Sequence, residues 1–111
     1  MRTEVRFRGR PRDAKLVEFV EARAARLPAW MRSEVRTARV WITDQNGPRG
    51  GHDCLVRVQL MSYGMGRVLV EGRGENALSG VAGAFERAAL VGAARAERDR
   101  GFGLDTIRRA S

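Results

Sequence analysis

Hydrophobic and polar residues alternate at the start of the chain. In residues 3–8 the apolar side chains fall on one side and the charged ones on the other, which is the period of a half-buried strand. Glycine and proline in residues 9–12 end this strand, and Asp13 follows as a candidate helix N-cap. Over residues 16–27 apolar side chains recur at spacings of three and four, which predicts an amphipathic helix that ends before Pro28.

Three further strands are predicted in the middle of the chain, over residues 34–44, 53–61 and 67–73. The polar segment 44–51 and the glycine-containing turn 63–66 join them into an antiparallel meander, and the length of the first connection suggests mobility. The start of the first of these strands is uncertain because its alternation slips by one residue. The positions expected to face inward are Val35, Ala38, Val40, Ile42, Cys54, Val56, Val58, Leu60, Val68 and Val70.

A long helix is predicted over residues 75–100, with Leu78, Val81, Phe85, Ala88 and Ala89 on its apolar face. Glycines at 80, 83 and 92 weaken such a helix by about 1 kcal/mol each relative to alanine, unless close packing requires them. We expect residues 101–111 to form a flexible tail, because they have no element to pack against. Trp30 and Met31 are expected to cap the end of the core.

The predicted order is therefore β-α-β-β-β-α, an α+β fold. We expect a four-stranded mixed sheet with two helices packed on one face, formed by a single domain over residues 1–100. The other face of the sheet would stay open. The side chains expected there are those of Arg6, Arg8, Arg39, Trp41, Arg57, Gln59, Arg67 and Arg73.

Charge changes this picture by pointing to a partner. The chain has 111 residues and a formal net charge of +8, and its basic residues are nearly all arginine, with Lys15 the only lysine. Arginine forks match phosphate oxygens, so we expect a polyanion and first of all a nucleic acid. The alternative is a soluble protein from a genome that favours arginine.

The sequence offers little for catalysis. Cys54 is the only cysteine, which excludes an internal disulfide and a cysteine-rich zinc site, and it falls at an inward position. His52, the only histidine, adjoins Asp53 without a nucleophile to activate, and the glycines at 64, 66, 72 and 74 complete no phosphate-binding motif. We expect no enzyme activity, cofactor, metal or small-molecule substrate.

The distribution of apolar residues also indicates where in the cell the protein is found. No apolar run approaches the roughly 20 residues that a membrane span needs, and the first ten residues lack the apolar region of a secretion signal. We therefore expect a cytoplasmic protein without membrane contact.

The arginines come from several elements, and we expect them to converge on one cationic surface. Arg23 and Arg26 share a face of the first helix, and Arg95 and Arg98 share a face of the last one, which also ends in Arg100. Each pair is equally compatible with a solvated helix face. Trp41 is available for stacking on RNA bases, or alternatively covers a cross-strand neighbour or a dimer contact.

The element order and the opening RTEVRFRGRPRDAKLVEFVEARAARL resemble the ribosome hibernation-promoting factor family, also called the ribosomal subunit interface proteins. The resemblance covers about residues 2–100. It implies binding to the small ribosomal subunit, in the channel used by mRNA and tRNA, and silencing of translation under stress. Family members use basic residues on both helices, which by position implies Arg23, Arg26, Arg87, Arg95 and Arg98.

The chain departs from the family pattern in its last helix. It has ENALSGVAG where the family opens this helix with an Asp-Tyr pair, and Leu90-Val91 where the family has Arg-Gln. Fewer phosphate contacts would give weaker, less salt-dependent binding. The alternative function is a protein-interaction module that forms a homodimer through the open sheet face. The predicted RNA-binding residues are Arg8, Arg23, Arg26, Arg39, Trp41, Arg87, Arg95, Arg98 and Arg100.

Overall fold

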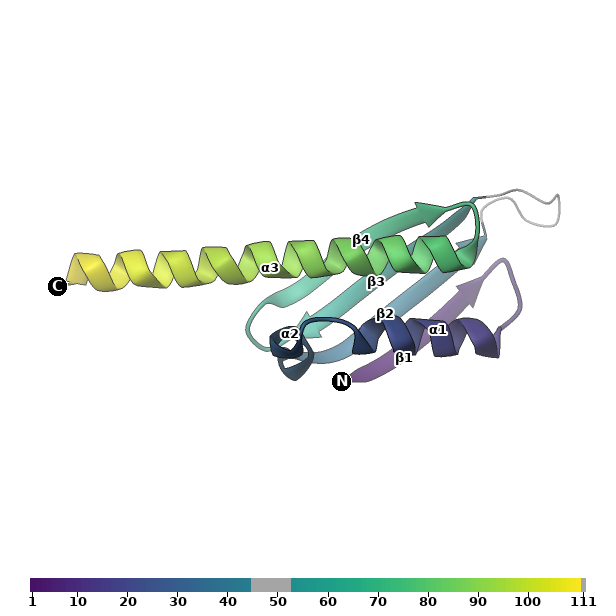
Figure 1. Ribbon diagram of the computed structural model, residues 1–111, viewed down its shortest axis with the longest axis horizontal. Helices are drawn as coiled ribbons and strands as arrows, with labels where there is room; N and C mark the ends of the chain where they lie inside the picture. The colour runs from purple at the N-terminus through teal and green to yellow at the C-terminus, as the bar shows by residue number, and fades with distance from the viewer. Residues whose placement is uncertain (45–52, 111) are drawn as a thin grey trace.

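The computed structural model describes residues 1–44 and 53–110, with side chains in residues 1–44 and 53–98. The predicted connection 44–51, apart from Asp44, and the predicted loop histidine His52 lie outside the described residues, as does the side chain of Arg100. The strands are β1 (Arg2–Arg8), β2 (Val35–Asp44), β3 (Cys54–Ser62) and β4 (Gly66–Gly74). The helices are α1 (Ala14–Ala25), α2 (Ala29–Glu34) and α3 (Ala77–Ala110) (Figure 1).

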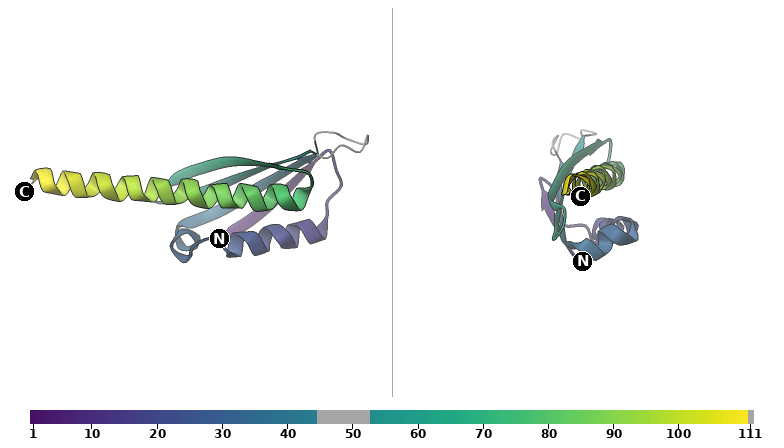
Figure 2. Two further views of the ribbon diagram at one scale, coloured as in Figure 1. Left: turned by 45° about the horizontal axis from the view of Figure 1, so that its top comes forward. Right: turned by 90° about the vertical axis from the view of Figure 1, so that its left-hand side faces the viewer.

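The four strands form one mixed sheet in the order β1-β2-β3-β4. The β1 and β2 strands are parallel, as the crossover through α1 requires, and the other two pairings are antiparallel. Both α1 and α3 lie on one side of the sheet (Figure 2). The predicted α+β architecture is confirmed.

The core lies between the sheet and the two long helices. Every position predicted to face inward on β2, β3 and β4 is buried. The slip at the start of β2 has a structural cause, because the register with β3 shifts between Val35 and Thr37. This bulge lets Val35 and Ala38 face the core although they are three residues apart.

The first helix begins as predicted. Asp13 caps α1, because its Oδ1 accepts hydrogen bonds from the backbone N–H groups of Lys15 at 2.9 Å and Leu16 at 3.4 Å. The following short helix α2 was not predicted. Its Met31 is fully buried, whereas Trp30 is 40% exposed, so only one of the two residues expected to cap the core does so.

Close packing explains two of the three glycines, at 80, 83 and 92, that the sequence analysis expected to weaken α3. A Cβ atom on Gly80 would lie 2.9 Å from Val56 Cγ2, and one on Gly92 would overlap the Met31 methyl carbon. On the facing strand, a Cβ on Gly72 would lie 2.6 Å from the backbone nitrogen of Ala84. The missing side chains let the α3 backbone lie directly on β4 at Gly72, against β3 at Gly80 and against α2 at Gly92, whereas Gly83 faces open space.

Two expectations for α3 are corrected. Leu78 is 49% exposed rather than part of the core, because the helix begins at Ala77 and buries that alanine instead. The helix also continues to Ala110, where the sequence indicated an end near residue 100, and it extends past the sheet (Figure 1). Flexibility of residues 101–111 stays a prediction, as does the division into domain and tail. Among the helices that the structure describes, none is long and apolar enough to cross a membrane.

Candidate nucleic-acid interface

The two faces of the sheet differ in what covers them. Helices α1 and α3 pack on one face, and no described element covers the other, which we call the open sheet face (Figure 2). All eight residues that the sequence assigned to this face lie on it, since they alternate with buried positions along β2, β3 and β4 and with the half-buried Val5 and Phe7 along β1. Its residues are Arg2, Glu4, Arg6 and Arg8 of β1, Thr37, Arg39, Trp41 and Thr43 of β2, Leu55, Arg57, Gln59 and Met61 of β3, and Arg67, Leu69, Glu71 and Arg73 of β4.

Positive charge is concentrated on the open sheet face. It carries seven arginines and two glutamates, a formal net charge of +5. We define the helical layer as α1 with its C-cap Arg26, α2, and α3 as far as Arg98. That layer carries seven basic and five acidic residues, a net charge of only +2. The residues that the family resemblance implied therefore lie on the less charged side.

Two cross-strand ion pairs fix arginines on the open sheet face. Arg39 Nε donates to Glu4 Oε2 at 2.6 Å, and Arg57 Nε donates to Glu71 Oε1 at 2.9 Å. The bond from Arg39 is the main reason why the pKa of Glu4 lies below its ordinary value. Such exposed pairs stabilise a fold little, but they fix the direction of each guanidinium.

Four other arginines on the open sheet face have no carboxylate partner among the described residues. They are Arg6 and Arg8 on β1, and Arg67 and Arg73 on β4, so they stand on the two outer strands. Arg2 contacts Glu4 at 3.5 Å, but that carboxylate is already bound by Arg39. The outer strands thus present unneutralised positive charge on both sides of β2 and β3.

Trp41 lies near the centre of the open sheet face. It is opposite Arg6 of β1 and Arg57 of β3 in the sheet register. A shallow hollow of about 430 Å³ lies beside it. The hollow is lined by Arg8, Trp41, Thr43, Leu55, Arg57, Gln59 and Leu69.

Arg23, in contrast, joins the two long helices. Its Nη2 donates to the backbone carbonyl of Ala82 in α3 at 3.3 Å and lies 3.8 Å from Glu86 Oε1. Only 21% of its side chain is exposed, and its Nε is buried without a hydrogen-bond partner in the described part of the chain. The structure therefore gives Arg23 a role in holding α1 against α3.

Two arginines of α3 reach across to the last strand. Arg87 Nη1 donates to the carbonyl of Glu71 at 3.3 Å. Arg95 Nη1 donates to the carbonyls of Met65, at 3.5 Å, and Arg67. Both guanidinium groups keep further N–H groups that could contact phosphate, but their positions are set by these bonds.

Arg26 and Arg98 are exposed and make no described side-chain contact. They lie on the helical layer, whereas Arg8, Arg39 and Trp41 lie on the open sheet face. The expectation that the arginines converge on one surface is therefore wrong. The predicted residues form two sets on opposite sides of the sheet, because strand alternation directs one set away from the helices.

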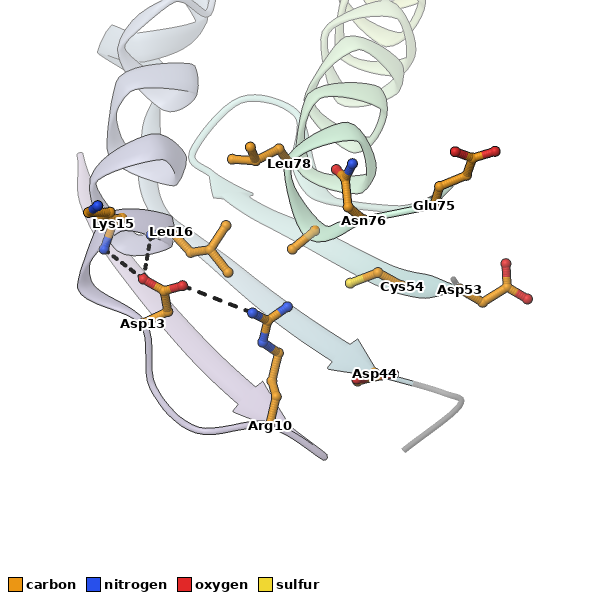
Figure 3. A pocket seen from close by; sticks show the side chains of 11 residues that line it. Arg10, Asp13, Lys15, Leu16, Asp44, Asp53, Cys54, Glu75, Asn76 and Leu78 are labelled. Atoms are coloured by element: carbon orange, nitrogen blue, oxygen red, sulfur yellow. Dashed lines mark hydrogen bonds and ion pairs between the residues drawn. The ribbon is translucent and has the colours of Figure 1, made fainter. Parts of the chain in front are cut away.

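A second hollow, of about 380 Å³, lies where α1 and α3 begin (Figure 3). Its lining includes Arg10, whose Nη2 lies 4.0 Å from Asp13 Oδ2, and Cys54. Cys54 is buried as predicted, and burial raises the pKa of its thiol, which makes it a poor nucleophile. Within the described residues, no three histidine, cysteine or acidic side chains gather closely enough to hold a metal ion.

Comparisons with known proteins identify the fold. No protein-family model matches the chain, and no curated protein sequence matches it significantly. Several solved structures have a similar fold, and two of them are described here. One is a ribosomal subunit interface protein from Coxiella burnetii, with a TM-score of 0.70 and 13% identity over 81% of this chain and 91% of that one. The other is the Protein Y N-terminal domain from Thermus thermophilus, with a TM-score of 0.69 and 17% identity over 83% and 96%.

This chain has the fold of the ribosomal subunit interface proteins. The resemblance seen in the sequence is thereby confirmed at the level of fold. The sequence analysis missed two carboxylates that pair with arginines, those of Glu4 and Glu71. Strand alternation is enough to place both on the open sheet face. Their partners are evident only from the strand register, in which Glu4 lies opposite Arg39 and Glu71 lies opposite Arg57.

Proposed function

We propose that this protein is a cytoplasmic, ribosome-associated factor that binds small-subunit rRNA in the mRNA and tRNA channel and silences translation under stress. It acts by occupying that channel and catalyses no reaction. The observation that carries the proposal is the fold, which this chain shares with a ribosomal subunit interface protein over 81% of its length. The net charge of +8 supports an RNA partner.

The helical layer supplies the first rRNA contacts. Arg26 and Arg98 are exposed and uncommitted to other described side chains, and Arg87 and Arg95 present their remaining N–H groups from fixed positions. Arg100 follows Arg98 on the same helix and adds to this set. Arg23 contributes mainly by holding α1 beside α3, so that Arg26 is correctly placed.

The alternative of a homodimer through the open sheet face is less favourable. Trp41, Leu55 and Leu69 provide an apolar contact there. Face-to-face association would, however, oppose two surfaces that each carry a formal charge of +5. Like charges brought together in this way cost free energy, whereas an RNA strand would neutralise them.

Sucrose-gradient sedimentation with purified small ribosomal subunits tests the proposal. We expect the protein to co-migrate with subunits at about 50 mM salt and to dissociate as the salt rises towards roughly 200 mM and beyond. The double substitution Arg26→Glu with Arg98→Glu should abolish co-migration while the thermal unfolding temperature stays near that of the wild type. Reversal of Arg23 is unsuitable for this test because it would also separate the helices.

A matched control also reverses two positive charges, but near the other end of α1. Arg12 and Lys15 are exposed and lie at the start of that helix, so Arg12→Glu with Lys15→Glu lowers the net charge equally. This variant should keep most of its binding. If the wild type fails to co-migrate at any salt concentration, or if both double variants lose binding to the same extent, a localised rRNA site on the helical layer is ruled out.

A further inference from the structure

Within the described part of the chain, the open sheet face is more charged than the helical layer that the family resemblance implies. The open sheet face carries +5 and the helical layer +2, and the two lie on opposite sides of the sheet. We propose that the open sheet face is a second RNA site, which binds an unpaired RNA segment with one base stacked on Trp41. This inference rests on the proposed function in taking RNA as the partner.

The hollow beside Trp41 has the chemistry of a base-binding site. Trp41, Leu55 and Leu69 provide apolar surface, and Arg8 and Arg57 bring positive charge to the same place. A volume of about 430 Å³ accommodates a planar base. Every base has a π-face, so stacking on an aromatic side chain holds single strands with little regard to sequence.

Polar groups around the hollow can hold the rest of a nucleotide. Gln59 also lines the hollow. Its Nε2 donates to Met61 Sδ at 3.1 Å, which leaves one N–H and the carbonyl oxygen of the amide for a base edge. Arg57 is oriented by its 2.9 Å bond to Glu71, and its other N–H groups remain for a phosphate. The guanidinium is thus positioned before RNA arrives, which lowers the entropy lost on binding.

Unpaired arginines flank this centre on both outer strands. Arg6 and Arg8 lie on β1 and Arg67 and Arg73 on β4, with no carboxylate partner among the described residues. An RNA strand that crosses the face would meet cationic groups before and after Trp41. Duplex RNA suits this arrangement less, since its bases are already stacked on each other and its deep major groove hides them.

Binding of a single-stranded oligoribonucleotide of about ten nucleotides tests the proposal directly. The oligonucleotide carries an end label for anisotropy, and the protein carries Trp30→Phe so that intrinsic fluorescence reports Trp41 alone. We expect quenching of Trp41 and at least tenfold weaker binding of a duplex of the same length. Trp41→Ala should weaken binding about tenfold, whereas Trp41→Phe should keep most of the affinity.

The arginines are tested through salt dependence. Arg8→Gln with Arg73→Gln should lower the slope of log affinity against log salt by about 1.4, because each phosphate contact with a single strand contributes about 0.7. The matched control, Arg12→Gln with Lys15→Gln near the start of α1, should leave the affinity for the oligonucleotide and its salt slope unchanged. Thermal unfolding of each variant confirms that it is folded.

Three results would overturn the inference. They are the absence of oligonucleotide binding, binding that is insensitive to Trp41→Ala, and a dimer in sedimentation equilibrium that Trp41→Ala dissociates. None of these affects co-migration with ribosomal subunits, which depends on Arg26 and Arg98 in the proposed function. Conversely, a protein that binds the oligonucleotide through Trp41 but never sediments with subunits would retain the sheet site and lose the ribosomal role.

Discussion

Replacement of Arg23 distinguishes a structural from an RNA-binding role for a residue that the sequence assigned to RNA. The Arg23 guanidinium makes a charge-assisted hydrogen bond to the Ala82 carbonyl at 3.3 Å, of a kind that contributes roughly 1.5–3 kcal/mol. Its contact with Glu86, at 3.8 Å, adds little because 73% of the Glu86 side chain is exposed. These contributions are opposed by the buried Nε, which has no hydrogen-bond partner among the described residues and lowers the stability of the fold by about 1–3 kcal/mol.

These opposing contributions predict different outcomes for two substitutions. Arg23→Met removes the bond and the unpaired Nε together, so its free energy of unfolding should stay within about 1 kcal/mol of the wild type. Arg23→Glu places a second carboxylate beside Glu86 and an acceptor beside the Ala82 carbonyl. That change should cost about 2–3 kcal/mol, or roughly 10–20 °C in melting temperature for a domain of this size.

Urea unfolding followed by circular dichroism measures these differences, and the same variants are then sedimented with ribosomal subunits. Arg26→Glu is the matched control, because it reverses an exposed charge at the C-cap of α1 and should cost no more than about 1 kcal/mol. Arg23 does not hold α1 against α3 if Arg23→Glu has the same free energy of unfolding as the wild type. A purely structural role is also excluded if Arg23→Met is stable but no longer binds subunits, since Arg23 would then contact RNA itself.

Three further predictions concern the fold. Gly72→Ala should destabilise the protein by about 1–3 kcal/mol, because its Cβ would lie 2.6 Å from the α3 backbone. Gly83 faces open space, so Gly83→Ala should stabilise α3 by up to about 1 kcal/mol. Urea unfolding measures both substitutions, and equal effects on the free energy of unfolding would contradict the close packing at Gly72. Cys54 should react with a thiol reagent only after unfolding, since burial raises its pKa, and rapid labelling of the native protein would disprove this. The Arg39 pair lowers the pKa of Glu4 below its ordinary value, so the pair stabilises the fold above that value, and this stabilisation is lost as the pH falls through the lowered pKa. The difference in unfolding free energy between wild type and Glu4→Gln should therefore shrink as the pH is lowered from neutral through that range, and a difference that does not change with pH would contradict this.

Much of the fold followed from periodicity because burial imposes it. The alternation in β3 and β4 predicted every buried position of those strands, since one face of each had to meet the helices. The errors occurred where local pattern is weak. The six residues of α2 are too few to show a helical period, and α3 buries Ala77 rather than Leu78 because the close approach of its backbone to β4 sets its rotation.

The candidate site was predicted less completely than the fold. Strand alternation placed Arg8, Arg39 and Trp41 on the open sheet face correctly. The helical arginines looked equivalent in the sequence, although Arg23 is committed to Ala82 and Arg26 is exposed. The difference depends on residues 59 positions apart that meet only when α1 and α3 lie side by side.

Local patterns and composition were enough to predict the sheet, the two long helices, the buried face of each strand and a strong positive charge. Each of these depends on neighbours within a few residues or on composition alone, so a linear pattern contains it. The division of that charge between the two sides of the sheet could not be predicted, because strand register and helix packing determine which arginine meets a carboxylate, a carbonyl or solvent. The concentration of positive charge around Trp41, on the side away from the helices, is a product of that packing.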